Sequence, residues 1–158
     1  MMHLRYVKQE DFDNLVLRSL PSDVEDLYID GDFVPIVRVP EGIESITIHK
    51  CGVRELHLPD SIKRIYVDGN LLHRLELPQG IEIVRASNNY ITEIVFRGGQ
   101  PTNLEQLYMK DNRIRRFDFE PPECMWGLDI RNNYHIDYIS PALSRLWNSI
   151  DELTIDNR

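Results

Sequence analysis

The sequence predicts a mainly β solenoid, in which short stacked coils each contribute one strand to a parallel sheet. Three observations support this prediction. A frame of apolar residues recurs along almost the whole chain, an asparagine recurs at one position of the frame, and proline opens the first four copies with a period of 19 residues, at Pro21, Pro40, Pro59 and Pro78. Such repeats must stack, because a single copy cannot bury its apolar face alone.

The frame reads apolar-x-x-apolar-x-apolar-x-x-Asn-x-apolar-x-x-apolar and is clearest over residues 104–117. In that copy Leu107 and Met109 alternate with polar residues, which is the pattern of a strand with one buried face. The sixth copy loses phase around residues 134–139, and the seventh is incomplete. The seven copies begin at Val24, Ile43, Ile62, Ile81, Leu104, Met125 and Ile150.

The recurring asparagine follows the strand, where the chain turns. Backbone N–H and C=O groups face the core at such a turn, and an asparagine amide can satisfy both because it donates and accepts. Asn70, Asn89, Asn112 and Asn133 fit this ladder. Cys51 and Asp32 stand at the same position in the first two copies; cysteine is a tolerated small substitute with a weak S–H donor, whereas aspartate can only accept.

The segments that return the chain to the next strand are expected to be short and extended. A repeat of 19 residues has no room for a strand, two turns and a full helix. The return segments alternate in polarity like strands rather than showing helical spacing. They comprise residues 56–59, 75–78, 94–96 and 117–119.

Residues 1–20 are expected to form an N-terminal cap, and residues 21–158 the repeat domain. Exposed solenoid ends need caps to remain soluble. Apolar residues at nearly helical spacing over residues 12–20 follow Glu10 and Asp11, which predicts a short amphipathic cap helix.

A second short helix is expected near the C-terminal end, over about residues 140–148. Ser140 can cap the helix and Pro141 suits its first position. We expect both tryptophans, Trp126 and Trp147, to pack in the core or against a cap.

The seven copies resemble the leucine-rich repeat family, in particular the short Leu-Pro-containing repeats of bacterial proteins, over about residues 20–158. The resemblance implies a right-handed superhelix whose parallel sheet forms a concave binding face. Members of that family often act as effector or adaptor proteins, and some are fused to a ubiquitin-ligase domain. We therefore expect a non-catalytic protein–protein interaction module. The alternative is a targeting or regulatory repeat fragment of a larger enzyme, such as an effector ubiquitin ligase.

Strand residues that point away from the core are the candidate binding residues. Three tyrosines share the central exposed column, and tyrosine offers large contact area with few rotatable bonds. Acidic residues lie on the first strands and basic residues on the fourth to sixth, a gradient that could orient a partner. The candidate residues are Tyr28, Asp30, His49, Tyr66, Asp68, Arg85, Tyr108, Lys110 and Arg131.

Other interpretations of these columns remain. Strand propensity alone favours tyrosine, and mixed charges also serve solubility. A hydrolase set is disfavoured, because His49 and Ser87 lie two strands apart, roughly 9–10 Å, while a nucleophile and its base need about 2.6–3.2 Å. Asp30 or Asp68 could pair with His49 and make binding mildly pH-dependent; a metal held by these three residues is the least favoured option.

Composition narrows the function further. The net charge of −8 disfavours nucleic-acid binding, and no stretch of the 158 residues suits a membrane span or a secretory signal. The two cysteines are too far apart in the frame to bridge and show no metal spacing. We expect a cytoplasmic monomer (in the host cytoplasm, if it is a secreted effector) with a protein partner, no cofactor and no metal.

Overall fold

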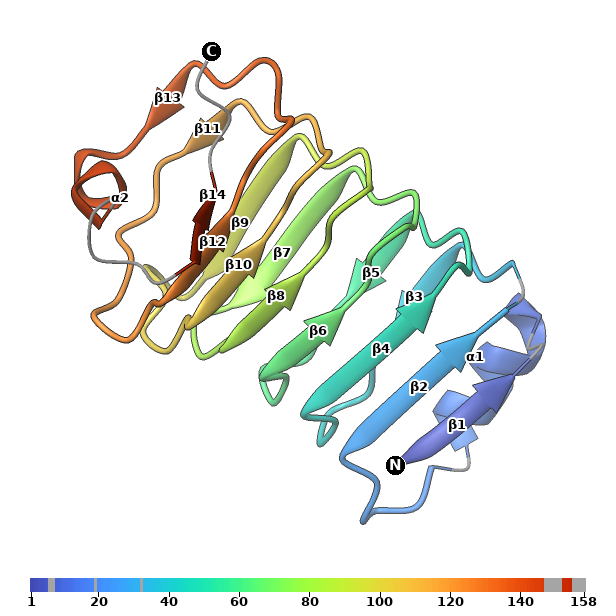
Figure 1. Cartoon of the computed structure of the whole chain (residues 1–158). Helices are drawn as coiled ribbons and strands as arrows, with labels where there is room; N and C mark the ends of the chain where they lie inside the picture. Colours follow the sequence, from blue (N-terminus) through green and yellow to red (C-terminus); the bar gives the residue numbers. More distant parts are fainter. Residues whose placement is uncertain (6–7, 19, 32, 147–151, 155–158) are drawn as a thin grey trace.

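The computed structural model describes residues 1–5, 8–18, 20–31, 33–146 and 152–154. It confirms the predicted β solenoid: parallel strands stack in one large sheet, short extended segments run behind it, and two short helices lie near the ends (Figure 1). In the part of the chain that the structure describes, no helix is long and apolar enough to span a membrane.

One eight-stranded sheet, the major sheet, runs the length of the molecule. All its strand pairs are parallel, and equivalent frame positions stand in register, as for Leu107 with Val84 on one side and Leu128 on the other. In sheet order the strands are β1 (Met2–Arg5), β2 (Asp26–Asp30), β4 (Ser45–His49), β6 (Arg64–Tyr66), β8 (Ile83–Arg85), β10 (Gln106–Tyr108), β12 (Gly127–Asp129) and β14 (Glu152–Thr154).

The return segments form short strands, as the alternation predicted. They pair two by two, so that this side of the solenoid consists of three separate two-stranded sheets. These sheets are β3 (Ile36–Arg38) with β5 (Glu55–His57), β7 (Arg74–Pro78) with β9 (Glu93–Arg97), and β11 (Arg116–Phe117) with β13 (Tyr138–Ile139).

The core lies between the two strand layers. Ile46, Ile65, Val84, Leu107 and Leu128 form one column of it, each with no exposed surface. Burying a side chain of this kind contributes about 1.5–3 kcal/mol. Because each column continues from coil to coil, every coil supplies the apolar surface that its neighbour needs.

The predicted asparagine ladder is present at four coils. The Asn89 amide nitrogen donates to the carbonyls of Val67, Ala86 and Ser87 at 3.1–3.2 Å, and its oxygen accepts from the Leu72 N–H at 3.0 Å. Asn70, Asn112 and Asn133 make the equivalent contacts. Each amide therefore forms hydrogen bonds with backbone groups of its own turn and of the turn in the preceding coil.

Cys51 fills the ladder position in a different way. Its thiol lies 3.4 Å from the carbonyl of His49 and 3.7 Å from that of Ile29. A thiol is a poor acceptor, and here the backbone carbonyl of Cys51 accepts the Val34 N–H at 2.8 Å instead. The backbone thus replaces the missing amide oxygen. Asp32 lies outside the described residues.

A left-handed backbone residue precedes the ladder position in each turn. Most residue types avoid this conformation; glycine, asparagine and aspartate tolerate it best. These types fill five of the six positions, a pattern that the frame did not include. The positions are Gly31, Lys50, Gly69, Asn88, Asp111 and Asn132, with φ between 53° and 98°.

The two ends match the prediction in part. A cap helix, α1 (Gln9–Arg18), covers the N-terminal end. The second helix, α2 (Pro141–Arg145), is capped by Ser140, whose hydroxyl accepts the Leu143 N–H at 3.1 Å. Strand β1 was not predicted: it adds a further rung to the major sheet ahead of the first repeat. The end of the second predicted helix, including Trp147, lies outside the described residues.

The packing prediction for Trp126 is wrong. Its side chain is 40% exposed. The frame explains this, because Trp126 directly follows the buried Met125 at a position that points outward in the other copies.

We predict that Asn89→Ala lowers the free energy of unfolding by about 1–3 kcal/mol, because buried backbone groups in two coils lose their partners. Asn103→Ala, at an exposed loop asparagine, is the matched control and should change it by less than about 0.5 kcal/mol. Urea unfolding of both variants measures the difference; equal stabilities would contradict the role of the ladder.

Candidate functional site

The outward face of the major sheet carries three parallel columns of side chains, one for each outward strand position. The register places the predicted central column in line from Tyr28 on β2 to Asp129 on β12, and His3 on β1 extends it by one rung. The described side chains of the central column are His3, Tyr28, Thr47, Tyr66, Arg85, Tyr108 and Asp129.

A cation–aromatic cluster occupies the middle of this column. The Arg85 guanidinium carbon lies 5.0 Å from the ring centre of Tyr108 and 5.9 Å from that of Tyr66. Arg85 also donates to the Gln106 amide oxygen at 3.1 Å. Contacts between a guanidinium and an aromatic ring at this range are attractive. Arg85, on β8, is thus held over the sheet by residues of the two neighbouring strands, β6 and β10.

Gly127 allows Tyr108 to lie across the neighbouring strand. A Cβ placed on Gly127 would be 2.7 Å from the Tyr108 hydroxyl and 3.2 Å from Gln106 Cγ. The tyrosine therefore occupies the space that a side chain on β12 would fill. Gln106 and Gly127 were missed by the sequence analysis, although a glycine within a strand frame often marks such a close approach.

Tyr28 is separate from this cluster. Its ring meets His3 edge-on, with the ring centres 4.2 Å apart, and Thr47 stands between Tyr28 and Tyr66 in the column. Of the three predicted tyrosines, the structure therefore brings two together around Arg85 and places the third at the N-terminal end.

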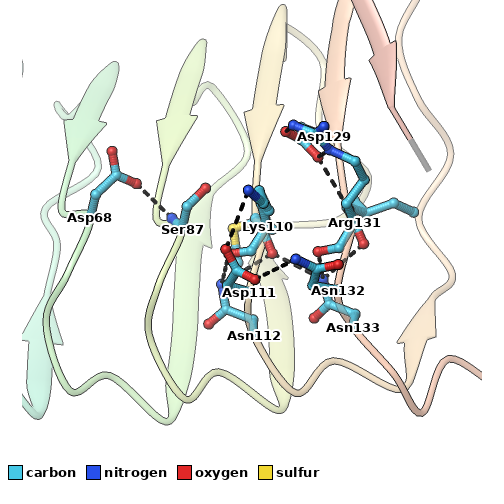
Figure 2. Close-up of polar contacts among 11 residues, drawn as sticks. Asp68, Ser87, Lys110, Asp111, Asn112, Asp129, Arg131, Asn132 and Asn133 are labelled. Atoms are coloured by element: carbon cyan, nitrogen blue, oxygen red, sulfur yellow. Dashed lines mark hydrogen bonds and ion pairs between the residues drawn. The ribbon is translucent and has the colours of Figure 1, made fainter. Parts of the chain in front are cut away.

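In the adjacent column, His49 pairs with one of its two predicted partners. His49 Nδ1 lies 3.2 Å from Asp30 Oδ1. Asp68 instead accepts the Ser87 backbone N–H at 2.6 Å (Figure 2). Among the described residues, no group of three His, Cys, Asp or Glu side chains could hold a metal ion.

The environment of Asp68 shifts its titration. Desolvation by partial burial raises the pKa of this carboxyl, against the smaller opposite effects of the Ser87 N–H and the Arg85 charge.

The predicted charge gradient is weaker than the residue types suggest. Arg131 forms two contacts with Asp129, at 3.0 and 2.7 Å, and Lys110 Nζ lies 3.6 Å from Asp111 (Figure 2). At the other end, Arg64 approaches Asp26 at 3.9 Å. Arg85, by contrast, contacts two tyrosine rings and an amide oxygen instead of a carboxylate, so that among the predicted basic residues it is the one best placed to pair with an acid of a partner.

The return side has a hollow between β5 and β7, two neighbouring strands that do not pair with each other. It has a volume of about 270 Å³ and is lined by Arg54, Arg97 and residues of these two strands. Arg74 contacts Glu76 at 3.0 Å and Glu93 at 3.3 Å, so that much of the charge around the hollow is neutralised internally.

Comparisons with protein-family models, with curated proteins and with solved structures found no match. The repeat frame and the geometry described above are therefore the basis for assigning a function.

We predict that Gly127→Ala displaces the Tyr108 ring and leaves the fold intact. The added methyl meets the flexible end of Tyr108 rather than backbone, so that the free energy of unfolding should change by less than about 1 kcal/mol. The NMR shifts of the Arg85 side chain, which lie under the influence of the ring, should move toward free-arginine values. Unchanged Arg85 shifts would show that Tyr108 does not lie over Gly127.

A second prediction concerns pH. Because folding raises the pKa of Asp68 above 3.8, the folded state binds this proton more tightly, and stability is lost as the pH rises through the raised pKa. Asp68→Asn should remove this loss while still accepting the Ser87 N–H. The stability of the variant relative to the wild type should therefore increase with pH in urea unfolding; a constant difference would contradict the shift.

Proposed function

We propose that this chain is a leucine-rich-repeat-type protein-binding module that recognises a protein partner through the outward face of the major sheet, without catalysis. The observation that carries the proposal is the cluster of Tyr66, Arg85 and Tyr108 near the middle of that face. Tyrosine and arginine are the residue types that dominate binding energy at protein interfaces, and they act best near the centre of the contact.

Pre-organisation supports the proposal. Arg85 is fixed by Gln106 and two rings, and Tyr108 by the gap above Gly127. Side chains already held in one arrangement lose less conformational entropy when a partner binds. The cluster therefore offers contact area with a small loss of conformational entropy on binding. It lies near the centre of a sheet whose strands are hydrogen-bonded to one another.

A mixed polar rim surrounds the cluster. The pairs Asp30–His49 and Asp129–Arg131 flank it along the sheet, and locally paired charges of this kind contribute to specificity more than to affinity. The rim favours a partner that contributes an apolar or aromatic centre and an acidic group for Arg85.

We place this function in the cytoplasm. Both cysteines are free thiols, and Cys124 is exposed. Exposed free thiols are typical of reducing compartments. The proposal includes a monomeric module with a protein partner, and it invokes no nucleic acid, membrane, cofactor or metal.

The test is affinity capture followed by mass spectrometry, comparing the wild type with a Tyr66→Ala/Tyr108→Ala variant. We expect partners captured by the wild type to bind this variant at least about tenfold more weakly, a loss of about 1.4 kcal/mol or more. Tyr138→Ala, at an exposed tyrosine on the return side, is the matched control and should capture as the wild type does. Undiminished capture by the double variant would refute the sheet face as the binding surface.

A further inference from the structure

A second surface lies along the edge of the solenoid, where the chain turns away from the major strands. The residue directly after the ladder position stands at this edge in each coil. We call this column the turn-edge row; it consists of Phe33, Gly52, Leu71, Tyr90, Arg113 and Tyr134. Three of its members are among the exposed large apolar side chains: Phe33 is 59%, Tyr90 38% and Tyr134 58% exposed.

Cationic and imidazole groups lie on the aromatic rings of this row. The Arg113 guanidinium carbon lies 4.5 Å from the ring centre of Tyr90, and His73 stacks on the same ring at 5.8 Å. The Arg54 guanidinium carbon lies 5.9 Å from the ring centre of Phe33. Phe33 itself spreads over Gly52, where a Cβ would be 2.8 Å from the ring.

The two arginines of this edge differ from the arginines that form ion pairs elsewhere on the surface. Arg74, Arg97, Arg115, Arg116 and Arg131 each contact a carboxylate within 4.0 Å. Within the described part of the chain, Arg54 and Arg113 have no carboxylate partner. In a protein with a net charge of −8, these two cations therefore remain able to pair with the carboxylates of a partner.

Two hollows join along the same edge. One, of about 300 Å³, is lined by Arg54, Leu71, His73, Tyr90 and Arg113. The other, of about 490 Å³, shares Tyr90 and Arg113 and continues toward Tyr134 and His135. Asp111 also lines the second hollow, where it contacts Lys110 at 3.6 Å and accepts from the Asn132 amide at 2.6 Å. The surface is therefore a shallow, largely apolar depression with Arg54 and Arg113 along it and one carboxylate that already has partners.

We propose that the turn edge is a second docking surface, and that it binds an extended acidic peptide segment of a protein partner. Carboxylates of the peptide pair with Arg54 and Arg113, and apolar side chains between them contact Phe33, Leu71 and Tyr90. Such a site is independent of the face of the major sheet, because it uses different residues on a different side of each coil.

Charge decides between a peptide and a nucleic acid. A single-stranded nucleic acid carries one charge per nucleotide and needs a basic surface along its whole length. The turn edge offers two arginines without acid partners, beside two histidines, in an acidic protein. Two or three carboxylates among apolar residues match this surface better than a polyanion does.

The length of the row suits a short segment. Its six coils are separated by five strand spacings of about 4.8 Å, or roughly 24 Å in all. An extended peptide spans this distance with about seven residues.

The experiment uses an array of heptapeptides composed of aspartate, glutamate, leucine and tyrosine, beside a matched array in which asparagine and glutamine replace the acids. The full chain should bind members of the acidic array and ignore their amide counterparts. The strongest peptide, labelled with a fluorophore, should bind more weakly as the salt concentration rises. Its Kd should increase at least tenfold for Arg54→Gln/Arg113→Gln.

Arg74→Gln/Arg116→Gln is the matched control, since it removes two arginines from the return side, and its Kd should stay within twofold of the wild type. All four residues are exposed, and circular dichroism verifies that both variants fold. Absence of binding to the acidic array, equal binding to both arrays, or a Kd unaffected by Arg54→Gln/Arg113→Gln would overturn the proposal. Displacement of the peptide by oligothymidine at lower concentration than by unlabelled peptide would reassign the edge to nucleic acid.

Discussion

The structure depends on one constraint: the backbone groups of every turn must find partners inside the next coil. The asparagine amides meet it by donating to carbonyls of two coils and accepting an N–H from the preceding one. This contact fixes the stacking distance and the register together. The apolar columns could tolerate some slippage between coils, but a displaced amide would leave buried polar groups without partners, which is costly. The exposed columns on the sheet face and at the turn edge follow from that register.

Cys51 shows how strictly the constraint operates. Its thiol supplies only a weak donor, and the turn reorganises so that a backbone carbonyl accepts the Val34 N–H. Gly52, which follows with φ of 66°, permits this rearrangement and also leaves room for the Phe33 ring. The Cys51-Gly52 sequence, which departs from the repeat, thus has two effects. The Val34 N–H finds a backbone partner in the interior, and the Phe33 ring lies over Gly52 at the turn edge.

The frame predicted those features that repeat. It located the strands, the extended return segments and the ladder at Asn89 and its equivalents, because each of these is forced by burial or by backbone partners. It did not predict β1, which precedes the first copy. It also could not show that Arg85 would lie between Tyr66 and Tyr108 while Lys110 and Arg131 would contact acids, since exposed side chains choose partners by rotamer and distance rather than by period. Trp126 was predicted to pack in the core or against a cap, although its position in the frame points outward.

The pairing of the return strands has a mechanical consequence. The major sheet is continuous from β1 to β14, whereas the opposite side is divided into three hydrogen-bonded blocks. Bending that separates the three blocks breaks no strand pairing, whereas bending that pulls the major strands apart would break the pairing of the continuous sheet. In the described part of the chain, neighbouring return strands fail to pair at two places, between β5 and β7 and between β9 and β11. Separation of these blocks would leave the strand ladder of the major sheet paired, so that the spacing of the return segments is less constrained by backbone hydrogen bonds than the spacing of the major strands.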